Sequence, residues 1–382
     1  MKVKRLSLLV FACVLVGFAG SNPGFSQVHG FPGKSVQGPG TQPALFFACC
    51  DHGIVAADQL FSLPAVIPTL EKLHATLVVA VSDFSPERAQ LVRRLNEAGI
   101  PLIAWVELPG EGTYVNAGNT EQSRAAFSEF EQWSQQNGLH WRGVGLDIEP
   151  NFQEFARLRG HPWTLARLLM RRYFDRSRVM RARDAYGHLI GDLRARGYFV
   201  QTYQLPFIVA ERREHSTLLE RLLGIVDVRG DQEALMVYTS YAPEVGAGMI
   251  WTLGPQAQAL AVGVTEGDPT AGPRGVPLDW QDFSRDLIVA AHFSSTVGVY
   301  NLEGCVKQGF LDRLQTMDWG QTVLIPPTMV RRARWMSRAA RGAIWVGTWL
   351  PAIFSVFIVL LAGTWFWWRR RRLVRLKAGA FE

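Results

Sequence analysis

Short apolar runs alternate with longer helical patterns between residues 42 and 319 of the chain. Apolar runs rich in β-branched and aromatic residues are typical of buried strands, whereas apolar residues that recur every three or four positions are typical of amphipathic helices. We expect strands at residues 44–50, 75–82, 101–107, 143–149, 198–203, 234–238, 259–264 and 296–301. We expect helices at residues 86–98, 121–136, 217–226, 279–291 and 306–316, with a helical insertion over residues 163–196.

This alternation predicts an α/β fold in which crossover helices join the strands of a parallel sheet. Eight such units in roughly 280 residues is the size of a (β/α)8 TIM barrel. A doubly wound open sheet is the alternative, but no glycine-rich phosphate loop follows the first strand, where Cys50, Asp51, His52 and Gly53 stand instead. We therefore expect one TIM-barrel domain over residues 28–325.

Polar and aromatic residues gather at the ends of the predicted strands, where the loops of a TIM barrel form its active face. The strand ends carry Asp51, His52, Asp83, Trp105, Glu107, Asp147, Glu149, Tyr203, Gln204, Tyr238, Glu266, Asn301 and Glu303. The barrel hypothesis thus predicts that chemistry takes place at this mouth.

The segment 142–150 has the sharpest local pattern. Side chains alternate along a strand, so Asp147 and Glu149 share one face while Val144, Leu146 and Ile148 share the other. Two neighbouring carboxylates repel each other when both are ionised, which raises one pKa and can hold a proton ready for a leaving group. We take Glu149 as the candidate general acid and Asp147 as its modulator; the alternative is a salt-bridged pair that serves packing.

This segment resembles the fourth-strand motif Asp-Gly-x-Asp-x-Asp-x-Glu of chitinase-type (family 18) glycoside hydrolases, with Gly143, Asp147 and Glu149 as the matching positions. Arg142 and Gly145 stand where two acidic residues of the motif would be. Residues 236–239 resemble the Met-x-Tyr-Asp of the same family and supply Tyr238. The resemblance implies that Glu149 is the acid and that Asp147 orients a 2-acetamido group of the substrate, which acts as nucleophile.

A second resemblance is to the retaining β-glycosidases that share this barrel and carry Asn-Glu-Pro after strand four and a nucleophilic glutamate after strand seven. Glu149 and Pro150 keep the Glu-Pro, and Glu266 stands at the end of the seventh strand. This resemblance implies that Glu266 is the nucleophile. Retention requires two carboxyl groups about 5–5.5 Å apart. Both resemblances make Glu149 the acid.

The remaining strand-end residues are candidates for substrate binding. Aromatic rings can stack on the apolar faces of sugars, and polar groups can bind hydroxyls. We assign this role to Asp51, His52, Trp105, Glu107, Tyr203, Gln204, Asn301 and Glu303. The histidines are scattered and no His-x-x-x-His or Cys-x-x-Cys pair occurs, so we expect no metal site, and we expect no cofactor.

Hydrophobic segments lie near both ends of the chain. Three basic residues precede an apolar run at residues 6–18, which predicts a signal peptide over residues 1–27, with an uncleaved N-terminal anchor as the alternative. Residues 343–368 carry no charge and are long enough to cross a bilayer as one helix. A basic juxtamembrane segment at residues 326–342 precedes them and a basic tail at residues 369–382 follows. We therefore expect a single-pass membrane protein with the barrel on the extracytoplasmic side.

The charge distribution argues against a nucleic-acid partner. The chain has 40 basic and 33 acidic residues, but about a third of the basic residues lie in the three terminal segments 1–27, 326–342 and 369–382. The remaining domain is net acidic, whereas nucleic-acid binding requires basic residues clustered on the folded part. Cys305 and either Cys49 or Cys50 are expected at neighbouring strand ends, where a disulfide or buried free thiols are the two alternatives.

Together these patterns predict a membrane-anchored glycoside hydrolase that cleaves a cell-envelope or secreted polysaccharide, with Glu149 as the general acid. The lipid bilayer is its second expected partner. The alternative is a catalytically inactive barrel that binds carbohydrate or scaffolds an envelope polysaccharide complex.

Overall fold

The structure is a computed structural model that describes residues 33–110, 114–267 and 276–378. In the C-terminal helix α15 (Pro327–Ala378), the structure does not describe the side chains of residues 353, 354, 356, 357, 363, 366, 367 and 369–378. The expected signal peptide at residues 1–27 lies outside the described residues.

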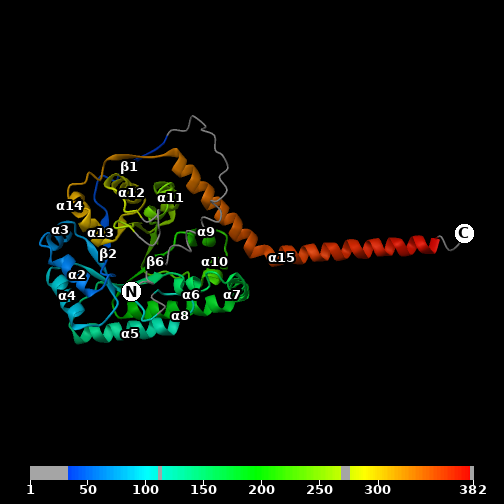
Figure 1. Ribbon diagram of the computed structural model, residues 1–382, viewed down its shortest axis with the longest axis horizontal. Coiled ribbons are helices and arrows are strands. Elements are labelled where there is room, and N and C mark those ends of the chain that lie inside the picture. Colours follow the sequence, from blue (N-terminus) through cyan, green and yellow to red (C-terminus); the bar gives the residue numbers. More distant parts are fainter. Residues whose placement is uncertain (1–32, 111–113, 268–275, 379–382) are drawn as a thin grey trace.

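Eight parallel strands form a closed barrel, as the alternating pattern predicted (Figure 1). In barrel order they are β2 (Ala44–Cys49), β3 (Thr76–Val81), β4 (Leu102–Val106), β5 (Gly143–Ile148), β6 (Phe199–Gln204), β7 (Gln232–Met236), β8 (Ala259–Gly263) and β9 (Thr296–Tyr300). The last strand pairs with the first, with Ala44 opposite Thr296 and Ala48 opposite Tyr300. Because all strands run the same way, their carboxyl ends meet at one mouth.

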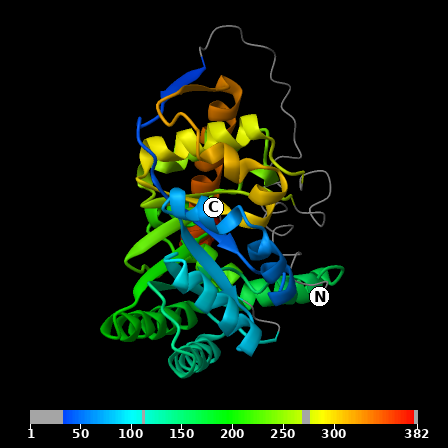
Figure 2. The ribbon, with the colours of Figure 1, turned by 90° about the vertical axis from the view of Figure 1, so that its left-hand side faces the viewer.

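Helices surround these strands (Figure 2). They are α2 (Ile54–Ser62), α3 (Val66–Lys72), α4 (Pro86–Glu97), α5 (Thr120–Gln136), α6 (Phe152–Arg157), α7 (Pro162–Phe174), α8 (Arg176–Ala195), α9 (Ile208–Arg213), α10 (Leu218–Leu223), α11 (Gly246–Leu253), α12 (Trp280–Phe293), α13 (Leu302–Lys307) and α14 (Phe310–Leu314). The expected insertion at residues 163–196 is the pair α7 and α8. The expected helix at residues 217–226 is shorter, because Gly224 adopts a left-handed conformation that ends it.

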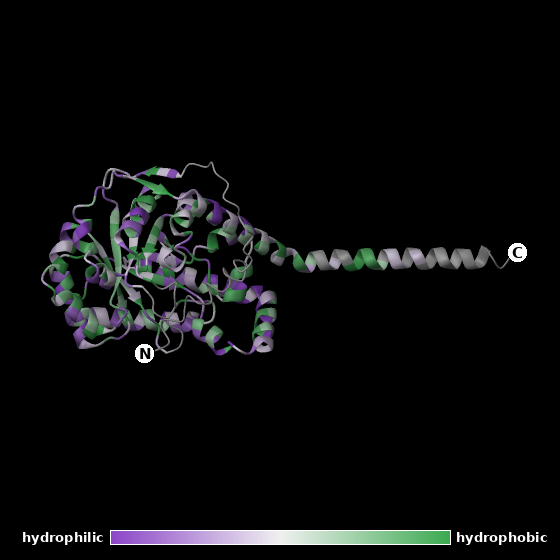
Figure 3. Cartoon of the chain, turned by 45° about the horizontal axis from the view of Figure 1, so that its top comes forward, coloured by the Kyte–Doolittle hydropathy of each residue, from purple (hydrophilic) through white to green (hydrophobic). Residues whose placement is uncertain are grey.

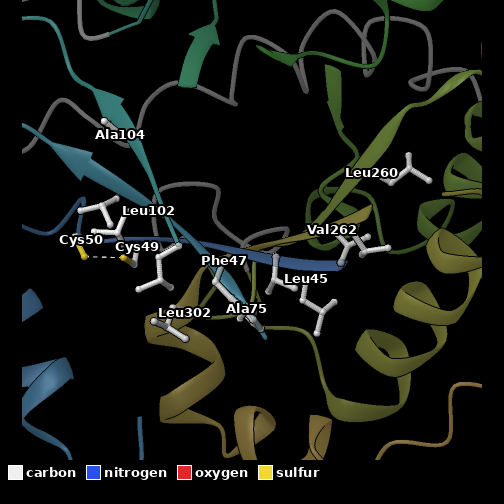
Figure 4. Packing of buried hydrophobic residues seen from close by; sticks show 14 of the residues in the cluster. Leu45, Phe47, Cys49, Cys50, Ala75, Leu102, Ala104, Leu260, Val262 and Leu302 are labelled. Atoms are coloured by element: carbon white, nitrogen blue, oxygen red, sulfur yellow. Dashed lines mark hydrogen bonds between the residues drawn. The ribbon is translucent and has the colours of Figure 1, made fainter. Parts of the chain in front are cut away.

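The hydrophobic core has two parts that follow the alternation of the strands. One part fills the barrel interior with side chains such as Phe46, Trp105 and Tyr203, and the other lies between strands and helices (Figure 4). A side chain at Gly145 would meet the ring of Tyr203 at 2.8 Å, so this position leaves room for the aromatic ring that fills the interior.

Two short strands outside the barrel pair with each other in an antiparallel way. β1 (Lys34–Gln37) precedes the barrel, and β10 (Thr322–Ile325) follows it and leads into α15 (Pro327–Ala378). The first part of α15 packs on α11 so closely that a side chain at Gly248 would stand 2.3 Å from the carbonyl oxygen of Met329. Val330, Ala333 and Ile344 are buried along this part of α15. The basic segment at residues 326–342 is therefore helical and packs on the barrel domain.

The distal part of α15 projects away from the barrel (Figures 1 and 3). It contains the span expected at residues 343–368, part of whose side chains are outside the description. Within the described residues, no single helix has the length and hydropathy of a membrane span, and α2 with α3 meets that test only as a pair bent by 75°.

Candidate active site

Two carboxyl groups from β5 enter the barrel mouth on the same face. Val144, Leu146 and Ile148 are fully buried on the opposite face, in the core between strands and helices. Asp147 therefore points to the interior, and Glu149, one residue beyond the strand, follows it. Both are more than nine-tenths buried, with 7% and 5% of their surface exposed. The pattern of the sequence thus predicted the orientation of this strand correctly.

One oxygen of each carboxyl group has no donor among the described residues that would stabilise the ionised form. Asp147 Oδ1 and Glu149 Oε2 are buried and have no hydrogen-bond partner among the described residues. Burial, and next the charge of Glu107 at the end of β4, raise the pKa of Asp147 to about 8. Burial, and next the charge of Asp147, raise the pKa of Glu149 well above its usual range. The group therefore retains protons at neutral pH, as a general acid requires.

Aromatic side chains line the same region. Tyr203 donates a hydrogen bond from Oη to Gln201 Oε1 at 2.6 Å, and Tyr238 stacks on Tyr300 with ring centroids 5.3 Å apart. Trp105 is buried in the barrel interior, and its Nε1 has no hydrogen-bond partner among the described residues. Burial, and next the charge of Asp147, raise the pKa of both Tyr203 and Tyr238, so these phenols stay protonated. The mouth thus offers rings and hydroxyl groups beside the acidic pair.

The ends of β2, β8 and β9 form a second polar group. His52 Nε2 lies 2.8 Å from Glu266 Oε1, and Tyr300 Oη donates to Asp51 Oδ2 at 2.8 Å. The hydrogen bond to Glu266 raises the pKa of His52 to about 9 against the opposing effect of burial. His52 is therefore a cation at neutral pH and pairs with the Glu266 carboxylate.

Glu303 belongs to this second group as well. Its Oε1 accepts a hydrogen bond of 2.7 Å from the backbone N–H of Cys50, which ties α13 to the end of β2. Burial, and next the charge of Asp51, raise the pKa of Glu303 to about 7.

Two residues that we assigned to substrate binding lie elsewhere. Gln204 shares the outer face of β6 with Val200 and Thr202, and its amide donates to the carbonyl oxygens of Val226 at 3.0 Å and Val228 at 3.4 Å. Asn301 is buried and caps α13, because its Oδ1 accepts from the backbone N–H of Gly304 at 3.0 Å. Both assignments ignored strand alternation, which directs a side chain next to an inward one to the outside.

Sequence reasoning missed Tyr300. It is the last residue of β9, where the alternation Gly298–Tyr300 places it on the interior face beside Asp51 and Tyr238. The signal was present in the predicted run at residues 296–301, but the following Asn301 was chosen instead.

Of the two alternatives for the cysteines, the structure has buried free thiols, because Cys49, Cys50 and Cys305 are free and buried. The sulfur atoms of Cys49 and Cys50 lie 2.7 Å apart (Figure 4), whereas the thiol of Cys305 forms a hydrogen bond with the side chain of Thr265. Cys305 turns aside after β9 because α13 begins at Leu302. Within residues 33–110, 114–267 and 276–378, no group of three or more His, Cys, Asp or Glu side chains is placed to hold a metal ion.

Comparison with known proteins gives no family model and no curated protein that matches this chain. Solved structures of similar fold include a GH18 chitinase from Pseudoalteromonas aurantia, with 10% identity, a TM-score of 0.44, and coverage of 72% of this chain and 99% of that one. They also include PbGH5A, a glycoside hydrolase family 5 enzyme from Prevotella bryantii B14, with 13% identity, a TM-score of 0.37, and coverage of 81% and 100%. A tryptophan synthase α-subunit from Pyrococcus furiosus has 10% identity, a TM-score of 0.37, and coverage of 74% and 98%. Barrels of different activities are thus similar to this chain.

Proposed function

We propose that this protein is a glycoside hydrolase with Glu149 as its general acid. The observation that supports this role best is the pair Asp147 and Glu149, buried at the mouth of the barrel with unpartnered oxygens and raised pKa values. A buried carboxyl group that costs stability and lacks partners is typical of a functional site. The resemblance of segment 142–150 to family 18 glycosidases points to the same residue.

The proposed reaction begins with proton transfer from Glu149 to the glycosidic oxygen while the bond from that oxygen to the anomeric carbon breaks. The leaving sugar takes the proton as a hydroxyl group. Water then adds to the anomeric carbon, and the Glu149 carboxylate accepts a proton from that water. Burial raises the pKa of Glu149 before proton transfer, and Asp147 can accept a hydrogen bond from the substrate.

The group that stabilises the positive charge at the anomeric carbon has two candidates, Glu266 and a group of the substrate oriented by Asp147. Glu266 is paired with His52 at 2.8 Å, which lowers the nucleophilicity of its carboxylate. The geometry therefore favours the substrate-assisted mechanism, in which Asp147 holds the substrate group and Glu266 supports the wall of the mouth.

The second candidate function is carbohydrate binding without catalysis. It is favoured by Arg142 and Gly145, which stand where the family 18 motif has acidic residues. A barrel of this kind would keep the aromatic lining of Trp105, Tyr203 and Tyr238 and bind or scaffold an envelope polysaccharide.

We also propose that the distal part of α15 anchors the protein in a membrane, with the barrel on the extracytoplasmic side. Residues 343–368, about 26 positions, would extend about 39 Å as a helix against a hydrocarbon core of about 30 Å. The helix exposes apolar side chains along its length, among them Trp349, Ile358, Val359 and Leu360, which are 52–69% exposed. Export would place an envelope or secreted polysaccharide within reach of the mouth.

The test is turnover of a panel of envelope and secreted polysaccharides by the purified full-length protein. Release of reducing ends that Glu149→Gln reduces by about 10²–10⁴-fold supports the enzyme. Glu97→Gln, on the exposed surface of α4, makes the same substitution away from the mouth and should leave turnover unchanged. Binding of a polysaccharide without turnover, unaffected by Glu149→Gln, would establish the second candidate instead.

A further inference from the structure

Helix α7 exposes an apolar stripe. Trp163 is 85% exposed, Met170 62% and Phe174 66%, and these residues follow one face of the helix at spacings of seven and four. Arg172 is the only residue of α7 that is buried. Another face of α7 is partly buried at Leu165, Leu168 and Leu169, so the exposed residues form a second apolar stripe, and an exposed apolar patch of this kind is typical of an interaction site.

The positive charge of α7 indicates that the partner of the apolar stripe is anionic. Residues 157–174 contain five arginines and no acidic residue, and Arg167 and Arg171 are exposed beside the apolar stripe. The exposed arginines of the first part of α15, among them Arg331, Arg334 and Arg338, add to this basic surface. An amphipathic helix with arginines at the border of an exposed aromatic stripe matches the headgroup region of an anionic bilayer.

The position of α7 beside α15 supports the same partner. Tyr173 donates a hydrogen bond from Oη to the carbonyl oxygen of Gly347 at 2.5 Å, and Ser216 Oγ lies 2.7 Å from Thr348 Oγ1. Arg221 lies over the ring of Tyr173, 5.2 Å from its centroid. The hydrogen bond of Tyr173 joins α7 to α15 where the exposed apolar part of α15 begins, and Ser216 and Arg221 join the α10 region to α15 and to α7. Figure 1 shows α7 at the side of the barrel from which α15 projects.

We propose that α7 is an interfacial helix that lies in the headgroup region of an anionic phospholipid bilayer. Trp163, Met170 and Phe174 enter the acyl boundary, while Arg167 and Arg171 contact lipid phosphates. This inference rests on the proposed membrane anchor in α15. Together the two helices hold the barrel in one orientation over the membrane, because a single spanning helix leaves the tilt of the barrel relative to the bilayer plane unfixed.

The experiment uses the full-length protein in nanodiscs of phosphatidylglycerol and phosphatidylcholine, with an environment-sensitive fluorophore on one introduced cysteine at a time. Met170→Cys reports on α7 and Ile358→Cys on the distal part of α15. Val55→Cys on α2, an equally exposed apolar position at 70%, is the matched control. The native cysteines in the described chain are buried, and labelling of the protein without an introduced cysteine sets the background.

We expect brominated lipids to quench the label at 170 and at 358 by at least about twofold and to leave the label at 55 unchanged. Trp163→Glu combined with Phe174→Glu should abolish quenching at 170 and preserve it at 358. Replacing the anionic lipid with phosphatidylcholine alone should weaken quenching at 170 more than at 358.

Quenching at 358 without quenching at 170 would overturn the role of α7 and leave the anchor standing. Absence of quenching at both positions would overturn the anchor and, with it, this inference. A shift of the label at 170 that depends on protein concentration and not on brominated lipid would assign the apolar stripe to contact with a second copy of the chain, which also overturns the proposal.

Discussion

The two sides of the barrel mouth differ in the charges and hydrogen-bond donors that surround their carboxyl groups. On the side of β4 and β5, Asp147 and Glu149 each have a buried oxygen without a partner among the described residues. On the side of β2, β8 and β9, Glu266 meets a cationic His52, and Glu303 accepts from the backbone of Cys50. The second side also has buried oxygens without a partner among the described residues, Asp51 Oδ1 and Glu303 Oε2, and the pKa of Glu303 is raised to about 7. It differs from the first side in having a cation, His52, within the group, whereas no cation contributes to the pKa shifts of Asp147 and Glu149.

This difference assigns separate roles to the two sides. Burial raises the pKa of Asp147 and Glu149, and like charges raise it further. An uncompensated cost of this kind persists where a reaction requires a retained proton. The paired residues on the other side position loops and α13, so their loss should affect structure more than chemistry.

The largest effect that the comparison predicts is in Glu149→Gln. Turnover of a susceptible polysaccharide should fall by about 10²–10⁴-fold, because an amide cannot donate the proton. The free energy of unfolding should stay unchanged or rise near neutral pH, since a neutral amide replaces a carboxyl group that burial already keeps protonated. Kinetics and urea unfolding check the two parts. A loss of stability together with activity would make Glu149 a packing residue like those of the other side.

The next effect is in the pH dependence of stability. The pKa of Asp147 is about 8 in the folded protein, against an ordinary value of 3.8. Between these values the folded state binds more protons than the unfolded state, so this residue makes stability fall as pH rises, by at most about 1.4 kcal/mol per pH unit. Below and above that window its contribution is constant. Asp147→Asn should therefore flatten the curve of unfolding free energy between about pH 4 and pH 8.

Denaturant unfolding of both proteins at several pH values measures this difference. Asp58→Asn, at an exposed position on α2, makes the same chemical change outside the mouth and should reproduce the wild-type slope. Parallel curves for Asp147→Asn and wild type would contradict a raised pKa at Asp147.

A smaller effect is expected for Glu266→Gln. If Glu266 serves mainly as the partner of His52, turnover should fall by less than about tenfold, whereas loss of a covalent nucleophile should cost several orders of magnitude. His52→Gln should give a similar loss, and the double variant should add little, because both changes remove one interaction. A drop beyond about 10³-fold in Glu266→Gln alone would restore the retaining mechanism.

The sequence predicted the barrel because its signals are local and repeated. Eight apolar runs at near-regular spacing are compatible with few folds. Each predicted run corresponds to a strand whose bounds differ from the expected ones by a few residues at most. The orientation of β5 was equally predictable, because its aliphatic residues fill alternate positions without exception. Asp147 and Glu149 were therefore placed correctly from the alternation alone.

Elements without periodicity could not be predicted in this way. The helix α11 contains Gly246 and Gly248, which lower helix propensity, and it forms because Gly248 allows the close approach of α15. Contacts between residues far apart in the sequence could not be predicted either. The pairing of His52 with Glu266 joins the first and seventh strands of the barrel, and only the closed fold brings them together.

Tyr300 offers the smallest and most specific test of the two sides. Its Oη donates to Asp51 Oδ2 at 2.8 Å, while Tyr203 on the side of β5 and β6 donates to the neutral Gln201 Oε1 at 2.6 Å. A hydrogen bond to a carboxylate is roughly twice as strong as one between neutral groups, so Tyr300→Phe should destabilise the protein by about 1.5–3 kcal/mol and Tyr203→Phe by about 1 kcal/mol. Turnover of Tyr300→Phe should stay within about threefold of wild type, because the ring that stacks on Tyr238 is kept. Urea unfolding and kinetics on the two variants measure both quantities. Equal destabilisation would show that Asp51 is as uncompensated as Asp147, and a large loss of turnover in Tyr300→Phe would move the chemistry to the side of β2 and β9.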